Sequence, residues 1–161
     1  MIKKWRETIK FICKSDPAIK SSMEVFMYQG FHALLHHQLA HFFYKHNRFI
    51  IARFISQVSR MLTGIEIHPG AKIHHEVFID HGMGVVIGET AIIGKEVIIY
   101  HGVTLGASSL KAIDRHPIIG NNVIIGAHTQ IIGRISIGNN SKLAPSLLIK
   151  QNIPPNTVLK S

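Results

Sequence analysis

Two residues of the chain have the types and the spacing of an acid–base pair. Glu66 and His81 lie fifteen positions apart. A histidine has an ordinary pKa of about 6.5, so it accepts a proton near neutral pH, and a carboxylate on its other ring nitrogen orients the ring and supports the imidazolium. The pair could deprotonate a hydroxyl group, and it implies no nucleophile from the protein. A histidine at a turn beside a salt-bridged glutamate would give the same pattern.

Five further histidines lie between residues 32 and 46, and their spacing suggests metal binding. His32 and His36 are four positions apart, as are His37 and His41, and His46 follows. Histidines at this spacing share one helix face and can bind zinc together. Because no acidic partner lies between them and no third ligand is evident, we interpret them as surface or interface histidines and expect no metal.

The elements that must position Glu66 and His81 are revealed by a six-residue period that begins after Thr63. Each unit carries one aliphatic residue, often followed by glycine, with a small or β-branched residue four positions after the aliphatic one. Six residues of strand span about 20 Å, one flat side of a coil whose aliphatic residues stack inward. The pattern predicts a parallel β-helix over residues 63–161, and it argues against a sandwich. Glu66 and His81 would meet on adjacent coils. The aliphatic positions are Ile67, Ile73, Ile79, Ile87, Ile93, Ile99, Leu105, Ile119, Ile125, Ile131, Ile137, Leu143 and Ile149.

The six-residue period is interrupted at two places. Residues 80–86 contain two extra residues, and the segment 106–117 is eight residues longer than one unit. A repeat that stays in phase must expel extra residues as loops, and loops on a rigid scaffold often carry functional groups. We therefore expect an external loop around residues 107–117 and a site near these two interruptions.

Residues 1–62 form a separate α-helical domain in this interpretation. They contain nearly all the aromatic residues and one glycine, Gly30. Apolar residues recur at spacings of three and four on both sides of Asn47, which predicts two amphipathic helices joined there and a shorter helix ending around Lys14. The apolar positions are Phe31, Leu34, Leu35, Leu39, Phe42, Phe43, Phe49, Ile50, Phe54, Val58 and Met61.

Composition narrows the class of protein. The 161 residues are 46% hydrophobic with a formal net charge of +9, so a folded core is expected. The basic residues are dispersed, which argues against nucleic-acid binding and suits a phosphate-rich ligand such as coenzyme A. Neither a membrane span nor a signal peptide is evident. The single cysteine, Cys13, agrees with a reducing compartment, and we expect a cytoplasmic protein.

Several motifs together resemble the serine acetyltransferase family. They are Ile65-Glu66-Ile67-His68-Pro69-Gly70-Ala71, Ile79-Asp80-His81-Gly82, Val86-Ile87-Gly88-Glu89-Thr90, Gly102-Val103-Thr104-Leu105-Gly106 and Asp114-Arg115-His116-Pro117. The resemblance extends from about Asp16 to Pro155. It implies a left-handed parallel β-helix behind an α-helical N-terminal domain. This agrees with the helical spacing in residues 1–62 and the six-residue period after Thr63.

The resemblance also implies roles in acetyl transfer from acetyl-CoA to the hydroxyl of L-serine. His81 would remove the hydroxyl proton and Glu66 would orient it, with direct attack on the thioester. Asp16 and Asp80 would lie near the amino group of serine. Arg115 and His116 would lie near its carboxylate, so that opposite charges hold both ends of the zwitterion.

Coenzyme A, by the same resemblance, would lie in a groove between neighbouring subunits. Its arm would contact Gly106, Ala107 and Ala127, and Lys142 would lie near the phosphates. The resemblance implies a homo-oligomer, and the short N-terminal domain favours a trimer over a dimer of trimers. It also implies feedback inhibition by cysteine, which resembles serine.

The chain departs from the family pattern at several positions. Ala107-Ser108-Ser109 replaces an expected Gly-Gly-Thr-Gly stretch, which bears on the coenzyme A contacts, and Glu66 stands where many relatives have aspartate. The sequence ends at Ser161, before the tail by which relatives bind cysteine synthase, so we expect no such binding.

Three alternative functions remain open at the level of sequence. One is an acetyltransferase acting on a sugar or another amino acid. Another is a metal-dependent lyase of the carbonic anhydrase type, which is suggested by His81, His101, His116 and His128 but lacks the ligand spacing of that class. The third is a structural scaffold without activity.

Overall fold

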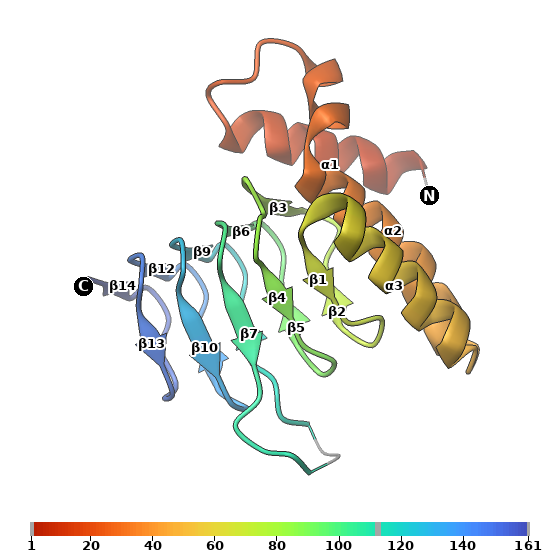
Figure 1. The fold of residues 1–161 in the computed structure, drawn as a ribbon. Helices are drawn as coiled ribbons and strands as arrows, with labels where there is room; N and C mark the ends of the chain where they lie inside the picture. Colours follow the sequence, from red (N-terminus) through yellow and green to blue (C-terminus); the bar gives the residue numbers. More distant parts are fainter. Residues whose placement is uncertain (1, 112–113, 161) are drawn as a thin grey trace.

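A computed structural model describes residues 2–111 and 114–160 (Figure 1). Residues 1, 112, 113 and 161, which include two positions of the expected 107–117 loop, lie outside the described residues. The helices are α1 (Ile2–Ser15), the short 3-10 helix η1 (Ser22–Met27), α2 (Gln29–Lys45) and α3 (Phe49–Thr63). The strands are β1 (Glu66–Ile67), β2 (Lys72–Ile73), β3 (Val77–Ile79), β4 (Val86–Ile87), β5 (Ile92–Ile93), β6 (Val97–Ile99), β7 (Thr104–Gly106), β8 (Ile118–Ile119), β9 (Ile124–Ile125), β10 (Gln130–Ile132), β11 (Ser136–Ile137), β12 (Lys142–Leu143), β13 (Leu148–Ile149) and β14 (Val158–Leu159).

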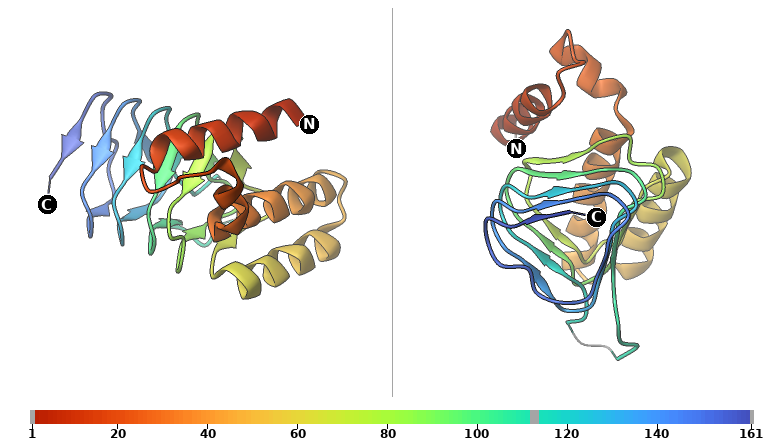
Figure 2. Two further views of the ribbon diagram at one scale, coloured as in Figure 1. Left: turned by 90° about the horizontal axis from the view of Figure 1, so that it is seen from above. Right: turned by 90° about the vertical axis from the view of Figure 1, so that its left-hand side faces the viewer.

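The strands wind into a three-sided coil, which is seen almost end-on in the right-hand view of Figure 2. The first side contains β1-β4-β7-β10-β13, the second β2-β5-β8-β11 and the third β3-β6-β9-β12-β14. Neighbouring strands are parallel throughout these three sheets. The predicted fold class, a parallel β-helix preceded by helices, is confirmed.

The core is a set of aliphatic columns, one for each side of the coil. On the first side Ile67 pairs with Ile87, Ile87 with Leu105, and Leu105 with Ile131. These side chains are at most 5% exposed. Of the thirteen predicted core positions only Ile73 is half-buried rather than buried. The six-residue period therefore identified the residues whose burial drives coil formation.

The strand register confirms both interruptions of the repeat. Val86 pairs with Thr104, which lies three repeats of six further along the chain. Glu66 pairs with Val86, and the chain between them is two residues longer than three repeats. Thr104 pairs with Gln130, and the chain between them is eight residues longer than three repeats. The extra residues form loops at the corners of the coil, because only an insertion at a corner leaves the aliphatic columns in register.

The helices pack at the first coil, at the end opposite the C-terminus (Figure 1). Helices α1 and α2 contact β3, and α3 contacts β1. The predicted helices and the turn near Asn47 are present, and η1 is an element that the apolar spacing did not reveal.

The apolar residues of the two amphipathic helices do not all face the core. Much of the stripe faces outward: Leu39 is 51% exposed, Phe54 68% and Ile50 87%. The buried face of α3 consists instead of small residues, Ala52, Ser56, Ser59 and Thr63. Small side chains allow the helix to lie close to the coil, and the large apolar ones are left on the surface.

His37 also differs from the expectation of a surface or interface histidine, because it is 6% exposed. Its Nδ1 atom has no hydrogen-bond partner among the described residues. Burial, with a smaller contribution from His41, lowers the pKa of His37 to about 3. The folded protein therefore holds this imidazole neutral.

This burial predicts acid sensitivity well above the carboxylate range. Below pH 6.5 the unfolded chain takes up a proton at His37 that the folded chain refuses, so stability falls as pH decreases from about 6.5 towards 4. The contribution of His37 is up to about 1.4 kcal/mol per pH unit. Chemical unfolding at a series of pH values should show a shallower dependence for His37→Gln. The exposed His46→Gln should behave as wild type, and equal slopes for wild type and His37→Gln would contradict the prediction.

Candidate active site

A cavity of about 410 Å³ lies where the N-terminal segment meets the corner between β3 and β4. Three residues selected from the sequence, Asp16, Asp80 and His81, line it together with Tyr28 and Gly30. Asp16 follows the end of α1, whereas Asp80 and His81 follow β3. Glycine is required at position 30, because a Cβ atom there would lie 2.1 Å from the carbonyl oxygen of Ile79. The close approach of α2 to β3 closes this side of the cavity.

Asp16 is held by two hydrogen bonds. The backbone N–H of Ala18 donates to its Oδ1 (2.8 Å), and the hydroxyl of Tyr28 donates to its Oδ2 (2.5 Å). The Tyr28 bond is the main reason that the pKa of Asp16 lies below its usual value. The same bond raises the pKa of Tyr28 to about 12. Asp16 is therefore ionised and oriented at neutral pH.

Asp80 and His81 occupy the corner itself. Asp80 Oδ1 lies 3.8 Å from Nε2 of His81, and the side chains are 17% and 74% exposed. Burial raises the pKa of Asp80, against the opposing influence of His81. His81 has a φ of 58°, as do corner residues such as Glu96 and His128 within a few degrees. The left-handed backbone thus belongs to the corner and does not single out His81.

Two more histidines stand at the same corner on the following coils. The His81 and His101 ring centroids are 6.0 Å apart, and those of His101 and His128 are 4.8 Å apart. The three imidazoles form a row parallel to the coil axis, starting at the cavity.

The predicted contact between Glu66 and His81 is not present. Among the described residues no hydrogen bond or ion pair joins them, and the Glu66 carboxylate pairs with Arg60 instead (3.2 Å). The reason lies in the length of the first coil, which places Val86 beside Glu66, so that His81 falls at the preceding corner. The carboxylate next to His81 is Asp80.

Arg115 and His116 are not at this cavity either. They lie at another corner, between the first and second sides of the coil, beside Glu89 and Thr90. Within one chain the two groups of predicted substrate-binding residues, Asp16 with Asp80 and Arg115 with His116, are therefore separated.

The Arg115–His116 corner is a donor-rich surface. Nη2 of Arg115 lies 3.8 Å from Glu89, and its Nη1 donates to the carbonyl of Ser109 (3.3 Å). The backbone N–H of Thr90 donates to Nδ1 of His116 (3.1 Å), so the Nε2 atom carries the proton of the neutral ring. Burial, followed by Arg115, lowers the pKa of His116 and favours that neutral form. One cation and one neutral N–H donor suit a carboxylate.

The four residues predicted to bind coenzyme A do not form one cluster in a single chain. Gly106 and Ala107 lie where β7 enters the external loop. Ala127 precedes His128 at the corner of the histidine row, and its carbonyl accepts a hydrogen bond from the N–H of Ser146 (2.8 Å). Lys142 is exposed on β12, on the third side. Their role stays a prediction.

Tyr28 is the residue of this site that the sequence reasoning missed. A signal was present, because Ser21 and Glu24 have the spacing of a capping box and predict a helix start between Asp16 and Tyr28. The structure contains that box at η1. The resulting reversal brings Tyr28 back to Asp16.

The arrangement can bind a small cation and accept a proton. Asp16 and Asp80 supply negative charge, and an exposed imidazole stands beside them. An amino group held by the two carboxylates would place a neighbouring hydroxyl within reach of His81.

Stacked hexapeptide coils with a polar site at a corner are typical of one class of transferases. The family model described as bacterial transferase hexapeptide (six repeats) matches residues 116–151. Over 160 residues the chain is 49% identical to a serine acetyltransferase of Staphylococcus epidermidis, covering 99% of this chain and 75% of that protein. The chain therefore belongs to the serine acetyltransferase family.

Solved structures agree with this family. Serine acetyltransferase isoform 3 of Entamoeba histolytica, in complex with cysteine, has a TM-score of 0.94 at 38% identity, over 99% of this chain and 57% of that one. The Neisseria gonorrhoeae enzyme in complex with serine has 0.94 at 37%, over 99% and 66%. The Brucella abortus enzyme in complex with coenzyme A has 0.94 at 37%, over 99% and 65%. The chain thus spans about six tenths of the length of these structures.

The contact between Tyr28 and Asp16 generates a prediction about ionisation. Tyr28→Phe removes the hydroxyl that stabilises the carboxylate, so the pKa of Asp16 should rise towards its ordinary value. An NMR titration of the Asp16 carboxyl carbon measures this shift. Tyr44→Phe is the matched control, because Tyr44 donates to Glu89 (2.9 Å) away from the cavity. An unchanged Asp16 titration in Tyr28→Phe would refute the assignment.

Proposed function

We propose that this chain transfers the acetyl group of acetyl-CoA to the hydroxyl of L-serine, giving O-acetylserine for cysteine biosynthesis. The observation that carries the proposal is the cavity in which Asp16 and Asp80 face His81. Family membership and the serine and coenzyme A complexes of similar proteins support the choice of substrates. The free thiol of Cys13 agrees with a cytoplasmic location. Within the part of the chain that the structure describes, no helix has the length and apolar character needed to cross a membrane.

The reaction is a direct transfer. His81 takes the proton of the serine hydroxyl while the hydroxyl oxygen attacks the thioester carbonyl. The bond from oxygen to the acetyl carbon forms, the carbon–sulfur bond breaks, and the departing thiolate receives the proton from the imidazolium. No acyl-enzyme is needed, and atoms and charge balance within the two substrates and His81.

Recognition of serine uses both corners. The amino group binds between Asp16 and Asp80, and the carboxylate binds Arg115 and His116. Since these two groups are separated in one chain, we infer that the second pair comes from a neighbouring subunit. A cyclic trimer would place the Arg115–His116 corner of one subunit against the His81 corner of the next, and would repeat this site three times.

The helical part supports association. Large apolar side chains lie exposed on α2 and α3, including Leu39, Phe42 and Phe54. Such surfaces usually mark interfaces. We assign subunit association partly to residues 1–62, which also supply Asp16 to the site, and the acetyl transfer itself to residues 63–161, with the trimer as the assembly.

Coenzyme A would follow the corner that carries the histidine row. The row leads from His81 past His101 to His128, which Ala127 precedes, and Lys142 is exposed on the coil that follows. The thioester would then lie at His81 and the phosphates towards Lys142, with Gly106 and Ala107 of the neighbouring subunit on the other wall.

Glu66 keeps the proposed role of orienting His81, through a change of partner. Its present ion pair is with Arg60, whose side chain is 57% exposed. An exposed ion pair contributes at most about 1 kcal/mol. The carboxylate can therefore leave Arg60 when substrates order the corner.

Cysteine is proposed as a feedback inhibitor of the same site. It has the amino and carboxylate groups of serine, so both corners would hold it. The cysteine complex of the Entamoeba histolytica protein supports this proposal.

Removal of the proposed base tests the function. His81→Ala should lower kcat/KM with serine by about 10²–10⁴-fold, because general-base catalysis contributes about that much. Glu66→Gln should lower kcat by less and leave KM for serine nearly unchanged, since Glu66 acts through His81. Release of coenzyme A thiol measures both, with a panel of amino acids and sugars as alternative acceptors.

The control for these assays is His46→Gln, an exposed change remote from the cavity. A wild-type protein without turnover on serine, or a His81→Ala variant with most of its activity, would refute the proposal. Full activity of Glu66→Gln would leave Asp80 as the carboxylate that serves His81.

Mixed oligomers test the shared site. His81→Ala and Arg115→Ala chains should each be inactive alone, but coexpression should restore roughly a quarter of wild-type activity. In a random cyclic mixture, about one site in four combines the intact His81 corner of one subunit with the intact Arg115 corner of the next. His81→Ala mixed with Asp80→Ala is the matched control and should restore nothing, because both changes affect the same corner. If neither mixture regains activity, the shared site is contradicted.

A further inference from the structure

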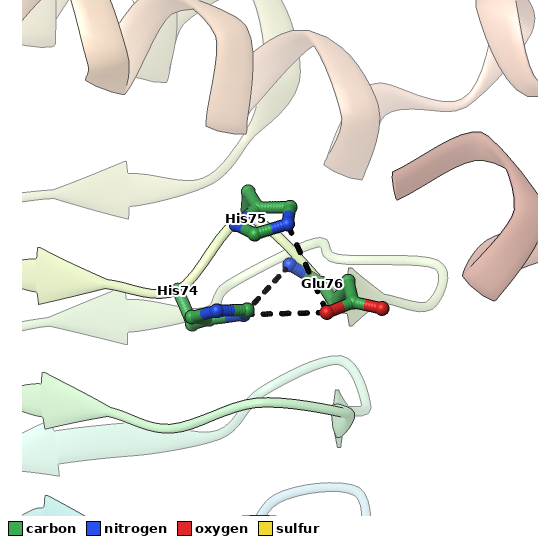
Figure 3. A group of neighbouring side chains, drawn as sticks. All are labelled: His74, His75 and Glu76. Atoms are coloured by element: carbon green, nitrogen blue, oxygen red, sulfur yellow. Dashed lines mark hydrogen bonds and ion pairs between the residues drawn. The ribbon is translucent and has the colours of Figure 1, made fainter. Parts of the chain in front are cut away.

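A second group of titratable side chains stands at the corner between β2 and β3, at the other end of β3 from His81. His74, His75 and Glu76 are consecutive, and each offers one ligand atom, all within 4.8 Å of one another. Figure 3 shows the two imidazoles and the carboxylate turned towards a common point. Glu76 Oε2 lies 3.8 Å from Nδ1 of His74 and 3.8 Å from Nε2 of His75.

A carboxylate of the N-terminal helix contacts one member of this group. Oε2 of Glu7, on α1, lies 2.9 Å from Nε2 of His75. Glu7 and His75 are 68 positions apart in the chain. The group of two imidazoles and one carboxylate is therefore linked through His75 to a second carboxylate on another element.

We propose that His74, His75 and Glu76 bind one divalent first-row transition cation, with Zn²⁺ as the best fit, and that Glu7 turns from His75 to the same cation as a fourth ligand, which fastens α1 to the first coil. Zinc bonds of about 2.0–2.1 Å to nitrogen and oxygen give a tetrahedron with edges of about 3.4 Å. Glu76 Oε2 lies 3.8 Å from each imidazole nitrogen, which is close to that edge. Imidazole and carboxylate ligands suit zinc, whereas magnesium and calcium prefer oxygen alone.

Two contacts compete with the cation. The Nζ atom of Lys95 lies 3.5 Å from Oε2 of Glu76. Lys95 is half-exposed and has a second partner in Glu96 (3.7 Å), so it can withdraw from Glu76. The backbone N–H of Glu76 donates to Nδ1 of His74 in a long bond of 3.2 Å, which a metal bond at that nitrogen would replace.

The cation would be structural. His74, His75 and Glu76 are separated from Asp80 and His81 by the whole of β3. The group takes no part in the acetyl transfer proposed above, so its test does not depend on that activity.

Trp5 supplies a local probe, because it lines a small cavity together with His74 and His75. It is the single tryptophan of the chain. Co²⁺ bound at the site should quench its fluorescence in a saturable way, and Zn²⁺ should reverse the quenching by displacement. Calorimetry of the full-length, chelator-treated protein should give one Zn²⁺ per chain and a raised melting temperature.

Substitutions test which residues bind the cation. His75→Ala and Glu76→Gln should each weaken Zn²⁺ binding at least tenfold and abolish the quenching. Glu7→Gln should weaken binding and remove the stabilisation of α1, and Lys95→Met should strengthen binding. The matched control is His32→Gln, which breaks another pair of imidazoles, His32 with His36 on α2 (ring centroids 6.4 Å apart), and should bind as wild type.

Three results would contradict the proposed zinc site or its link to α1. Absence of saturable Zn²⁺ binding below millimolar concentration would overturn it. Unchanged binding in His75→Ala would place any bound zinc elsewhere, such as the row of His81, His101 and His128. Unchanged binding and stabilisation in Glu7→Gln would overturn the link to α1.

Discussion

The whole molecule depends on stacking aliphatic side chains in register between parallel coils. Each hexapeptide contributes one such residue, and the column on each side of the coil tolerates no shift. Extra residues can therefore leave only at corners, and the two insertions that break the period do so beside Asp80–His81 and before Arg115–His116. The polar groups proposed to carry chemistry are excluded from the columns for the same reason. Packing thus confines the candidate site to the edges of the prism.

Electrostatics at the first of these corners separates two similar carboxylates. Tyr28 lowers the pKa of Asp16 by donating a hydrogen bond, whereas burial raises the pKa of Asp80. Both face an imidazole that stays largely exposed. At the second corner, a neutral His116 and a guanidinium offer donors to an anion. Within one chain the two corners lie apart, so the zwitterion site proposed above would require assembly, and the exposed apolar surface of α2 and α3 is consistent with that proposal.

Helix α1 links these features, because Asp16 follows directly after its last residue, Ser15. The position of α1 on the first coil therefore sets where one wall of the cavity lies. Glu7 and His75 hold that helix at the β2–β3 corner, and Gly30 allows α2 to approach β3 on the other side. The placement of a single carboxylate thus depends on contacts at both ends of β3.

The sequence alone determined the coil, its core residues and the location of its loops, since a period of six leaves one pattern of burial that satisfies every unit. It also indicated Asp16, Asp80 and His81 through the resemblance to a family. Tertiary structure decided what spacing could not. The longer first coil placed Val86 rather than His81 beside Glu66, the capping box at η1 returned Tyr28 to Asp16, and small residues on α3 turned the large apolar side chains outward. Each of these outcomes depends on how elements distant in the chain pack together, and a local sequence pattern does not specify that packing.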